Sequence, residues 1–372
     1  MAELRFNLAG AGGSLRSHYA PFMAYAEQHL LPLRIAAGEV APVIDAVLEW
    51  HESPPPQDRH TAEPELAGLE RLDRDLYVGP GRVCWFRIDD FRDLHLRFDW
   101  DGRQLHVHGH YYFYLSRDRL RDRTKRWWAG ARLRAQRLNR FTTLLYYLAY
   151  YPAFWWCETQ MGFHPIHAAG AVTDAGAVVL AGPSGVGKST LALALAAQPA
   201  QLLSETFLLH RGATLRPVRE PLLLDEWSRS WLGSAMSGLE PLRAGFVFSR
   251  NGYHRLAGLA EEGRAAAVLL PRRAPRTYVR AISAEEAHQR LSAANQIVKD
   301  MRRYWAFAAA LDPLAPSGLM AQREAELARL TAGARCGEFG LGPELKLGDA
   351  VRQVREFLSA ESLPVTRRAR CA

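Results

Sequence analysis

Cysteine is scarce in this chain and too widely spread to build a metal or disulfide framework. The 372 residues include 4 cysteines, and none of them forms a C-x-x-C pair. This disfavours a zinc ribbon and a small disulfide-stapled fold, and it favours a reducing compartment. The first residues, Met1 to Asn7, also lack the charged and then apolar pattern of a signal peptide. We therefore expect a cytoplasmic protein.

Long hydrophobic runs and internal repeats are missing as well. The most apolar stretch, residues 141–157, carries four tyrosines and Pro152, whereas a membrane span needs about 20 mostly apolar residues. This stretch predicts a buried helix packed against the nucleotide-binding sheet inferred below, with peripheral membrane contact as the alternative. With 48% hydrophobic and 23% charged residues, the chain is globular and long enough for two domains.

Acidic residues are nearly absent from residues 117–140, which we expect to form a helix. This segment has ten basic and two acidic residues, so its excess of +8 equals the formal net charge of the whole chain. A solvated face, an acidic protein or peptide partner and an anionic membrane surface all fit this pattern. Nucleic acid is disfavoured, because no nucleic-acid-binding motif accompanies the basic run.

The N-terminal part is otherwise rich in strand signals. Residues 76–115 are dense in aromatic and β-branched side chains and contain an Asp101-Gly102 turn, which predicts an antiparallel sheet. His106, His108 and His110 fall on one face of a strand. Two interpretations of these histidines remain: they bind a metal ion, or they lie on a half-exposed face of the sheet. The sequence offers no neighbouring carboxylate or cysteine as a further metal ligand. Residues 21–31 predict a helix, and residues 44–50 a strand or a helix end.

The most informative stretch matches the phosphate-binding loop pattern G-x-x-x-x-G-K-[ST]. Its residues are Gly182, Pro183, Ser184, Gly185, Val186, Gly187, Lys188, Ser189 and Thr190. An apolar run at residues 175–181 precedes it, and helix formers follow at residues 191–197. Strand, loop and helix in this order predict a cradle for nucleotide phosphates, in which Lys188 reaches the phosphates and Ser189 binds Mg²⁺.

Two residues flanking the loop complete a recognisable frame. His167 precedes it, and Glu205 follows it in a segment, residues 202–209, that predicts a strand. This frame resembles the HPr kinase/phosphorylase family, and more closely the HPr-kinase-related serine kinases. Weaker similarity continues through residues 269–273, which end in Arg272 and Arg273, and through residues 292–297. The resemblance covers roughly residues 160–310.

The resemblance implies an ATP- and Mg²⁺-dependent transfer of a phosphoryl group to a serine hydroxyl of a protein or peptide. It implies that Glu205 works near Mg²⁺ and the acceptor, and that His167 contacts Glu205. Arg272 or Arg273 would clamp the phosphoryl group. The chain departs from the family's Asp-Asp pair, because threonine stands at position 206. A catalytically weak regulatory or scaffold protein and a small-molecule kinase therefore remain alternatives.

The expected fold class is α/β. It comprises a P-loop kinase core of the HPr kinase type, an N-terminal α+β domain and C-terminal helices. The expected boundaries are 1–160 for the N-terminal domain, 161–283 for the core and 284–372 for a helical extension. Ser283 and Glu286 form a capping-box pattern, which predicts a helix from there to about residue 303. Two further helices are expected at residues 319–331 and 347–358. The sequence leaves homo-oligomerisation open.

Overall fold

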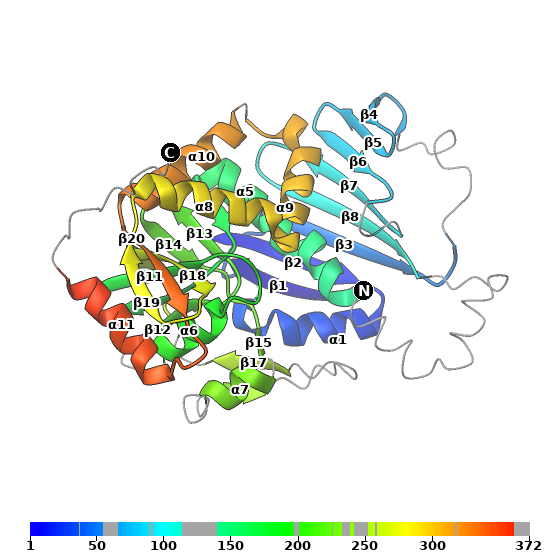
Figure 1. The fold of residues 1–372 in the computed structure, drawn as a ribbon. Coiled ribbons are helices and arrows are strands. Elements are labelled where there is room, and N and C mark those ends of the chain that lie inside the picture. The colour runs from blue at the N-terminus through cyan, green and yellow to red at the C-terminus, as the bar shows by residue number, and fades with distance from the viewer. Residues whose placement is uncertain are drawn as a thin grey trace, which may run out of the picture. The chain divides into compact units, whose positions relative to one another are not determined.

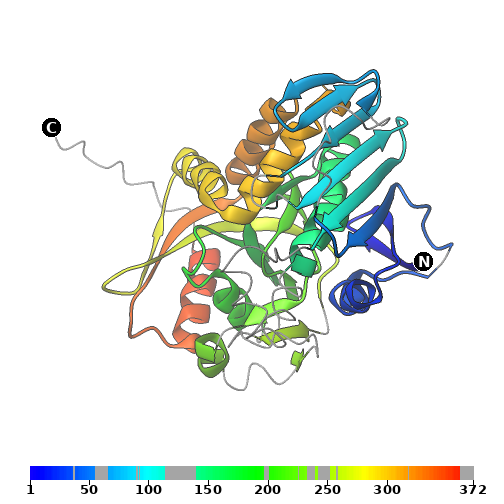
Figure 2. The same cartoon turned by 90° about the vertical axis from the view of Figure 1, so that its right-hand side faces the viewer.

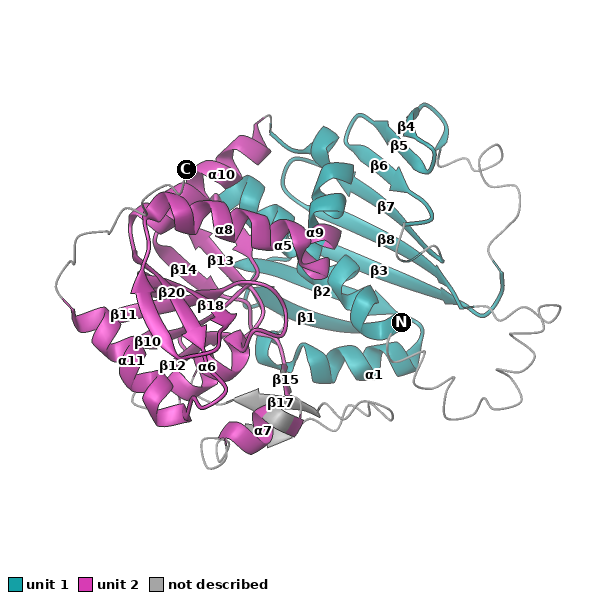
Figure 3. Cartoon of the chain, in the orientation of Figure 1, with its two compact units in different colours: residues 1–161, 242–250, 304–317 teal, residues 162–241, 251–303, 318–372 magenta. Residues whose placement is uncertain are grey.

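The chain divides into two compact units. The computed structural model describes residues 1–36, 38–54, 66–88, 91, 93–113, 140–196, 201–224, 226–232, 239–241, 252–256, 259–316 and 318–360 (Figure 1). Unit 1 comprises residues 1–161, 242–250 and 304–317, and unit 2 comprises the rest (Figure 3). All but the last residue of the helix predicted at 117–140 lies outside the described residues.

Unit 1 is built on an eight-stranded sheet in the order β1-β2-β3-β8-β7-β6-β5-β4. Its strands are β1 (Ala2–Leu8), β2 (Ala11–Ser17), β3 (Ile44–His51), β4 (Glu70–Asp73), β5 (Leu76–Gly79), β6 (Arg82–Trp85), β7 (Leu94–Trp100) and β8 (Leu105–Tyr112). The predicted antiparallel pairing is confirmed between β5, β6, β7 and β8. The whole sheet is nevertheless mixed, because β3 pairs in parallel with both β2 and β8.

Helical segments cover the apolar face of this sheet. Helix α1 (Ala20–His29) begins with Pro21 in its first turn and packs on β1 and β2. The aromatic stretch is helical, as predicted. It runs from residue 140 through η3 (Tyr146–Tyr150), α5 (Tyr151–Trp156) and η4 (Cys157–Met161), with π-helical turns in η3 and η4.

The position predicted for the aromatic stretch is wrong. It belongs to unit 1, where it packs on β2 and β3 of the eight-stranded sheet. Gly109 of β8 allows a close approach of this stretch to the sheet, because a Cβ there would lie 3.1 Å from Leu148 Cδ2.

Within the described parts of the chain, none of the helices combines the length and the apolar character needed to cross a bilayer.

Unit 2 contains a nine-stranded mixed sheet. Its main order is β12-β10-β11-β18-β14-β13-β9, and β20 joins β18 to β19. The strands are β9 (His164–Ile166), β10 (Ala168–Thr173), β11 (Gly176–Ala181), β12 (Gln201–Ser204), β13 (Leu208–Arg211), β14 (Thr214–Pro217), β18 (Gly263–Arg273), β19 (Tyr278–Ala281) and β20 (Arg335–Leu341). A small antiparallel sheet pairs β15 (Leu222–Leu224), β17 (Gly252–Leu256) and β16 (Leu239–Pro241).

Helices cover both faces of the large sheet of unit 2 (Figure 2). Helices α6 (Lys188–Ala196) and α11 (Leu347–Ser359) pack on one face, where they share a core with Leu180 and Phe339. Helices α8 (Ala284–Ile297) and α10 (Leu319–Ala332) pack on the other, over Leu270 and Cys336. A shorter helix, α7 (Glu226–Leu232), adds Leu232 to the first core.

The helix predicted from residue 284 to about residue 303 is two helices. Ser283 caps α8 as predicted, since its Oγ accepts a hydrogen bond of 3.0 Å from the Glu286 backbone N–H. The Glu286 carboxylate, however, pairs with Arg290 at 2.6 Å. The chain turns extended at Val298, and α9 (Lys299–Ala310) follows. The boundary between the two units falls inside α9, after Arg303.

The segment after residue 283 is not purely helical. The helices predicted at 319–331 and 347–358 are present as α10 and α11. Between them, β20 enters the large sheet, parallel to β18 and antiparallel to β19. The segment expected to be a helical extension therefore completes the sheet of unit 2.

Candidate functional site

The glycine-rich loop lies between a buried strand and a helix, as the sequence predicts. β11 ends at Ala181, and α6 begins at Lys188. Gly185 and Gly187 have φ angles of +78° and +97°, in the left-handed region that glycine adopts without the steric cost of a side chain. The loop therefore curves above the N-terminus of α6, where free backbone N–H groups and the helix dipole favour an anion.

Lys188 folds back onto the loop. Its ammonium donates hydrogen bonds to the carbonyl oxygens of Gly182 at 2.9 Å and Pro183 at 3.0 Å. The residue is only 5% exposed. Burial lowers the pKa of Lys188 to about 8, although the carboxylate of Glu205 acts in the opposite direction. A positive charge is thus held in a dry position at the loop.

Glu205 follows the end of β12, which is separated from β11 by one strand, β10. β12 pairs antiparallel with β10, and β10 pairs antiparallel with β11, so β12 and β11 end at the same edge of the sheet. The Oε1 atom of Glu205 accepts a hydrogen bond from the Ser189 hydroxyl, and its Oε2 atom accepts one from Thr206 at 2.8 Å. The predicted strand at 202–209 is interrupted here, because β12 ends at Ser204 and β13 starts at Leu208.

His167 is buried near Lys188, and the partners of its backbone and ring among the described residues are Asn295 and Phe207, not the predicted Glu205. Burial lowers the pKa of His167 to about 3, and the positive charge of Lys188 contributes, so the imidazole is neutral at physiological pH. Its backbone N–H donates to Asn295 of α8 at 3.1 Å, and its ring meets Phe207 edge to face. Within the described part of the chain, His167 Nδ1 has no hydrogen-bond partner.

A cavity of about 1370 Å³ opens over the loop. Residues 185–191 line one side, and Ser228, Ser230 and Trp231 of α7 line another. Residues 341–347, which follow β20, and the end of β18 complete the wall. Ligand pockets commonly hold about 300–1,000 Å³, so this cavity is large enough for a small-molecule ligand.

The two predicted arginines point to different places. Arg273 lines the cavity, and its Nη2 atom lies 3.5 Å from the Gly185 carbonyl oxygen. Arg272 is instead directed at Glu338 of β20, with 3.6 Å between Nη1 and Oε2. Neighbouring strand residues face opposite sides of a sheet, which explains the divergence. Arg273 is therefore the arginine positioned for a ligand in the cavity.

Glu338 is the centre of a charged cluster on β20. Its side chain is 2% exposed and also pairs with Arg290 and, at 3.1 Å, with Arg280. The hydroxyl of Tyr278 donates to it at 2.7 Å. Burial alone would raise the pKa of Glu338, but the Tyr278 hydroxyl and the guanidinium groups lower it to about 2. This cluster could not be predicted from the sequence, because its members come from four separate elements, β18, β19, α8 and β20.

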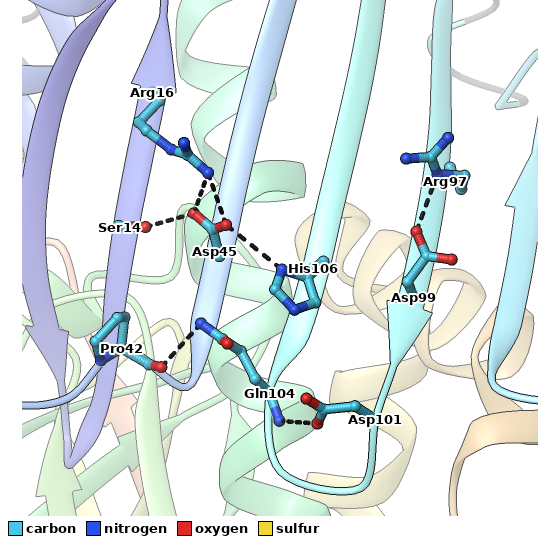
Figure 4. A network of polar contacts seen from close by, with 9 residues as sticks. All are labelled: Ser14, Arg16, Pro42, Asp45, Arg97, Asp99, Asp101, Gln104 and His106. Carbon is cyan, nitrogen blue, oxygen red and sulfur yellow. Dashed lines mark hydrogen bonds and ion pairs between the residues drawn. The ribbon is translucent and has the colours of Figure 1, made fainter.

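The histidines of β8 form part of a polar sheet face, as one of the two interpretations predicted. His106 lies 3.4 Å from Asp45, which also pairs with Arg16 at 2.7 Å (Figure 4). His110 has neighbours that the sequence did not reveal, because parallel pairing with β3 brings Glu49 and His51 beside it. Residue spacing alone could not identify partners that are separated by such a long stretch of chain.

Comparison with known proteins adds no assignment, since neither a family model nor a curated protein matches the chain. What this site can do follows from its chemistry. Its loop amides and lysine suit phosphate, and its serine hydroxyl and carboxylate offer the oxygen ligands that Mg²⁺ prefers.

Proposed function

We propose that this protein is an ATP- and Mg²⁺-dependent kinase that transfers a phosphoryl group to a hydroxyl, with serine in a protein or peptide as the acceptor. The observation that carries the proposal is the contact between the Ser189 hydroxyl and the Glu205 carboxylate at the mouth of a phosphate-type loop. A glycine-rich turn that binds no ligand does not require a carboxylate beside it, whereas a nucleotide site uses a carboxylate to hold Mg²⁺.

The residues fit Mg²⁺. Ser189 and Glu205 present hard oxygen ligands next to the loop, and Mg²⁺ is bound in proteins by one or two such groups together with substrate phosphates. A bound Mg²⁺ would neutralise negative charge on the phosphate oxygens. Thr206 donates to the second carboxylate oxygen and thereby helps to orient Glu205.

The remaining roles follow from position. Lys188 would turn from the loop carbonyls to the phosphates of ATP and balance their charge. Arg273 lines the same cavity, where a guanidinium can form two hydrogen bonds with a phosphoryl group. Glu205 also accepts the proton of the attacking hydroxyl. His167 is neutral and buried, so we assign it to packing against Phe207 and not to proton transfer.

The first test is nucleotide binding measured by calorimetry. Lys188→Ala should weaken MgATP binding by about 10- to 100-fold, since a hydrogen bond to a charged group contributes about 1.5–3 kcal/mol. Arg264→Ala is the control, because it removes one positive charge at the opposite end of β18, where Arg264 pairs with Thr214 of β14. Equal affinities of the wild type and Lys188→Ala for MgATP would refute the proposed site.

The second test is transfer from ATP labelled in its γ-phosphate to an array of serine peptides, with alanine peptides as blanks. Glu205→Gln keeps the shape of the side chain but removes its charge. It should retain nucleotide binding and lose about 10²–10⁴-fold in transfer rate, the usual contribution of a general base. A wild-type protein that binds MgATP but labels no peptide would favour the regulatory or small-molecule alternatives.

A further inference from the structure

The outer face of β3 and β8 brings three potential metal ligands together in unit 1. The two strands are parallel, and Glu49 is paired directly with His110. His51 follows Glu49 by two residues on β3, so both side chains point to the same face. Among the residues that the structure describes, these three form a cluster whose ligand atoms all lie within 4.8 Å of one another.

The distances within the cluster match one face of a coordination tetrahedron. His51 Nε2 lies 3.2 Å from His110 Nδ1 and 3.8 Å from Glu49 Oε2, and His110 Nδ1 lies 3.5 Å from the same oxygen. Zinc holds nitrogen and carboxylate oxygen at about 2.0–2.2 Å in a tetrahedron, which requires ligands about 3.3–3.6 Å apart. The three atoms could surround one ion with only small side-chain movements.

We propose that Glu49, His51 and His110 form a binding site for a divalent transition-metal ion of the Zn²⁺ type. Imidazole nitrogens select such ions over Mg²⁺, so this site is chemically distinct from the oxygen ligands Ser189 and Glu205 of unit 2. The three side chains are 49%, 30% and 34% exposed, respectively. Solvent therefore reaches the fourth position, which a water molecule or an external donor would fill.

The sheet holds the ligands in place. Both histidines are on central strands, and the ring of Tyr112 stacks on that of His51, with 4.6 Å between centroids and 17° between planes. The rings of His51 and His110 are within 13° of parallel. A metal site needs this kind of support, because neighbouring groups set the orientation of the ligating imidazoles.

The competing explanation is a hydrogen bond without a metal. One histidine can donate to the other across 3.2 Å if their tautomers are complementary. Such a pair would take up no Zn²⁺, so metal titration separates the two explanations.

The experiment is titration of the full-length chain, without a histidine tag and stripped by a chelator, with ZnCl₂ in a calorimeter. We expect one tight ion per chain in the presence of millimolar Mg²⁺. His51→Gln and His110→Gln, which keep polar side chains, should each weaken Zn²⁺ binding by at least about 10–100-fold. A loss of that size already results when a residue that only orients a metal ligand is replaced. Thermal melting checks that each variant is folded.

His106→Gln is the matched control. His106 lies on the same strand and face as His110, with side chains 35% and 34% exposed, but it contacts Asp45 instead of the cluster. It should bind Zn²⁺ like the wild type. Co²⁺ should give the visible absorption of a four-coordinate ion in the wild type and in His106→Gln, and lose it in His51→Gln. The proposal is overturned if the wild type takes up no Zn²⁺ at micromolar concentration, or if His106→Gln loses as much affinity as His110→Gln.

Discussion

Replacing Glu338 by Gln should destabilise unit 2 measurably. The carboxylate is 2% exposed and is surrounded by three arginines that come from β18, β19 and α8. Glutamine has nearly the same shape but no charge, so the substitution leaves the guanidinium groups without their common counter-ion. Removing one partner of a buried ion pair is costly because the other charge remains.

The magnitude follows from the pKa. The pKa of Glu338 falls from 4.5 to about 2, and each unit corresponds to about 1.4 kcal/mol, which gives an upper value of about 3 kcal/mol at neutral pH. The guanidinium groups of Arg272, Arg280 and Arg290 are 58%, 39% and 34% exposed, so solvent screens part of the interaction. We therefore expect a loss of about 2 kcal/mol.

Hydrogen exchange measured by mass spectrometry is the most direct assay. Backbone amides in peptides covering β18 and β20 should exchange about 30-fold faster in Glu338→Gln than in the wild type. This factor corresponds to a loss of about 2 kcal/mol, since about 1.4 kcal/mol changes an equilibrium constant tenfold. The pKa is depressed, so the stabilisation is complete above about pH 4.5 and disappears as the pH falls towards 2. The difference in melting temperature between wild type and variant should therefore shrink between pH 7 and pH 3.

Glu356→Gln provides the comparison. Glu356 of α11 also pairs with an arginine, Arg352, at 3.0 Å, but both side chains are about 60% exposed, and exposed pairs contribute little. If the two variants exchange equally fast in β20, or if the Glu338→Gln difference persists undiminished at pH 3, the argument from the buried carboxylate is wrong.

Because the pKa of Lys188 is about 8, calorimetry should show wild-type affinity for MgATP falling between pH 7 and pH 9, as the free ammonium loses its proton. Lys188→Arg, which stays charged, should show no such fall, and a flat wild-type profile would contradict the assignment. Tyr304→Phe should cost about 1–3 kcal/mol in urea unfolding, because it removes a donor from the buried carboxylate of Glu158; an unchanged midpoint would refute this. Binding of an acidic peptide by the basic segment 117–140 should weaken steeply with added salt, since exposed charges are screened over about 8–10 Å, whereas salt-independent binding would support a solvated face.

Local sequence predicted the loop region well. The glycines, the apolar run before them and the helix formers after them all act within a few residues, and the structure contains the expected strand, loop and helix at residues 176–196. The strand predicted to follow the loop helix is present in part as β12, and Glu205 comes directly after its last residue, Ser204. The kinase activity itself remains a prediction.

The pairing of strands that are far apart in the chain could not be predicted from the sequence. The parallel pairing of β3 with β8 joins segments far apart in the chain, so His110 was considered without Glu49 and His51. The Glu338 cluster was missed for the same reason. The break at Val298 carries no proline or glycine, and helix propensity alone would have continued through it.

The late position of β20 in the chain has a consequence for synthesis. β18 and β19 leave the ribosome before residues 335–341 exist, and β20 is the strand that links β19 to the sheet. Until it is made, β18 and β19 lack this neighbour, and unpaired strand edges readily associate with other chains. A chain that stops after residue 283 would lack β20 permanently, so we expect the part of unit 2 that carries the glycine-rich loop to need residues 335–341 to complete its sheet.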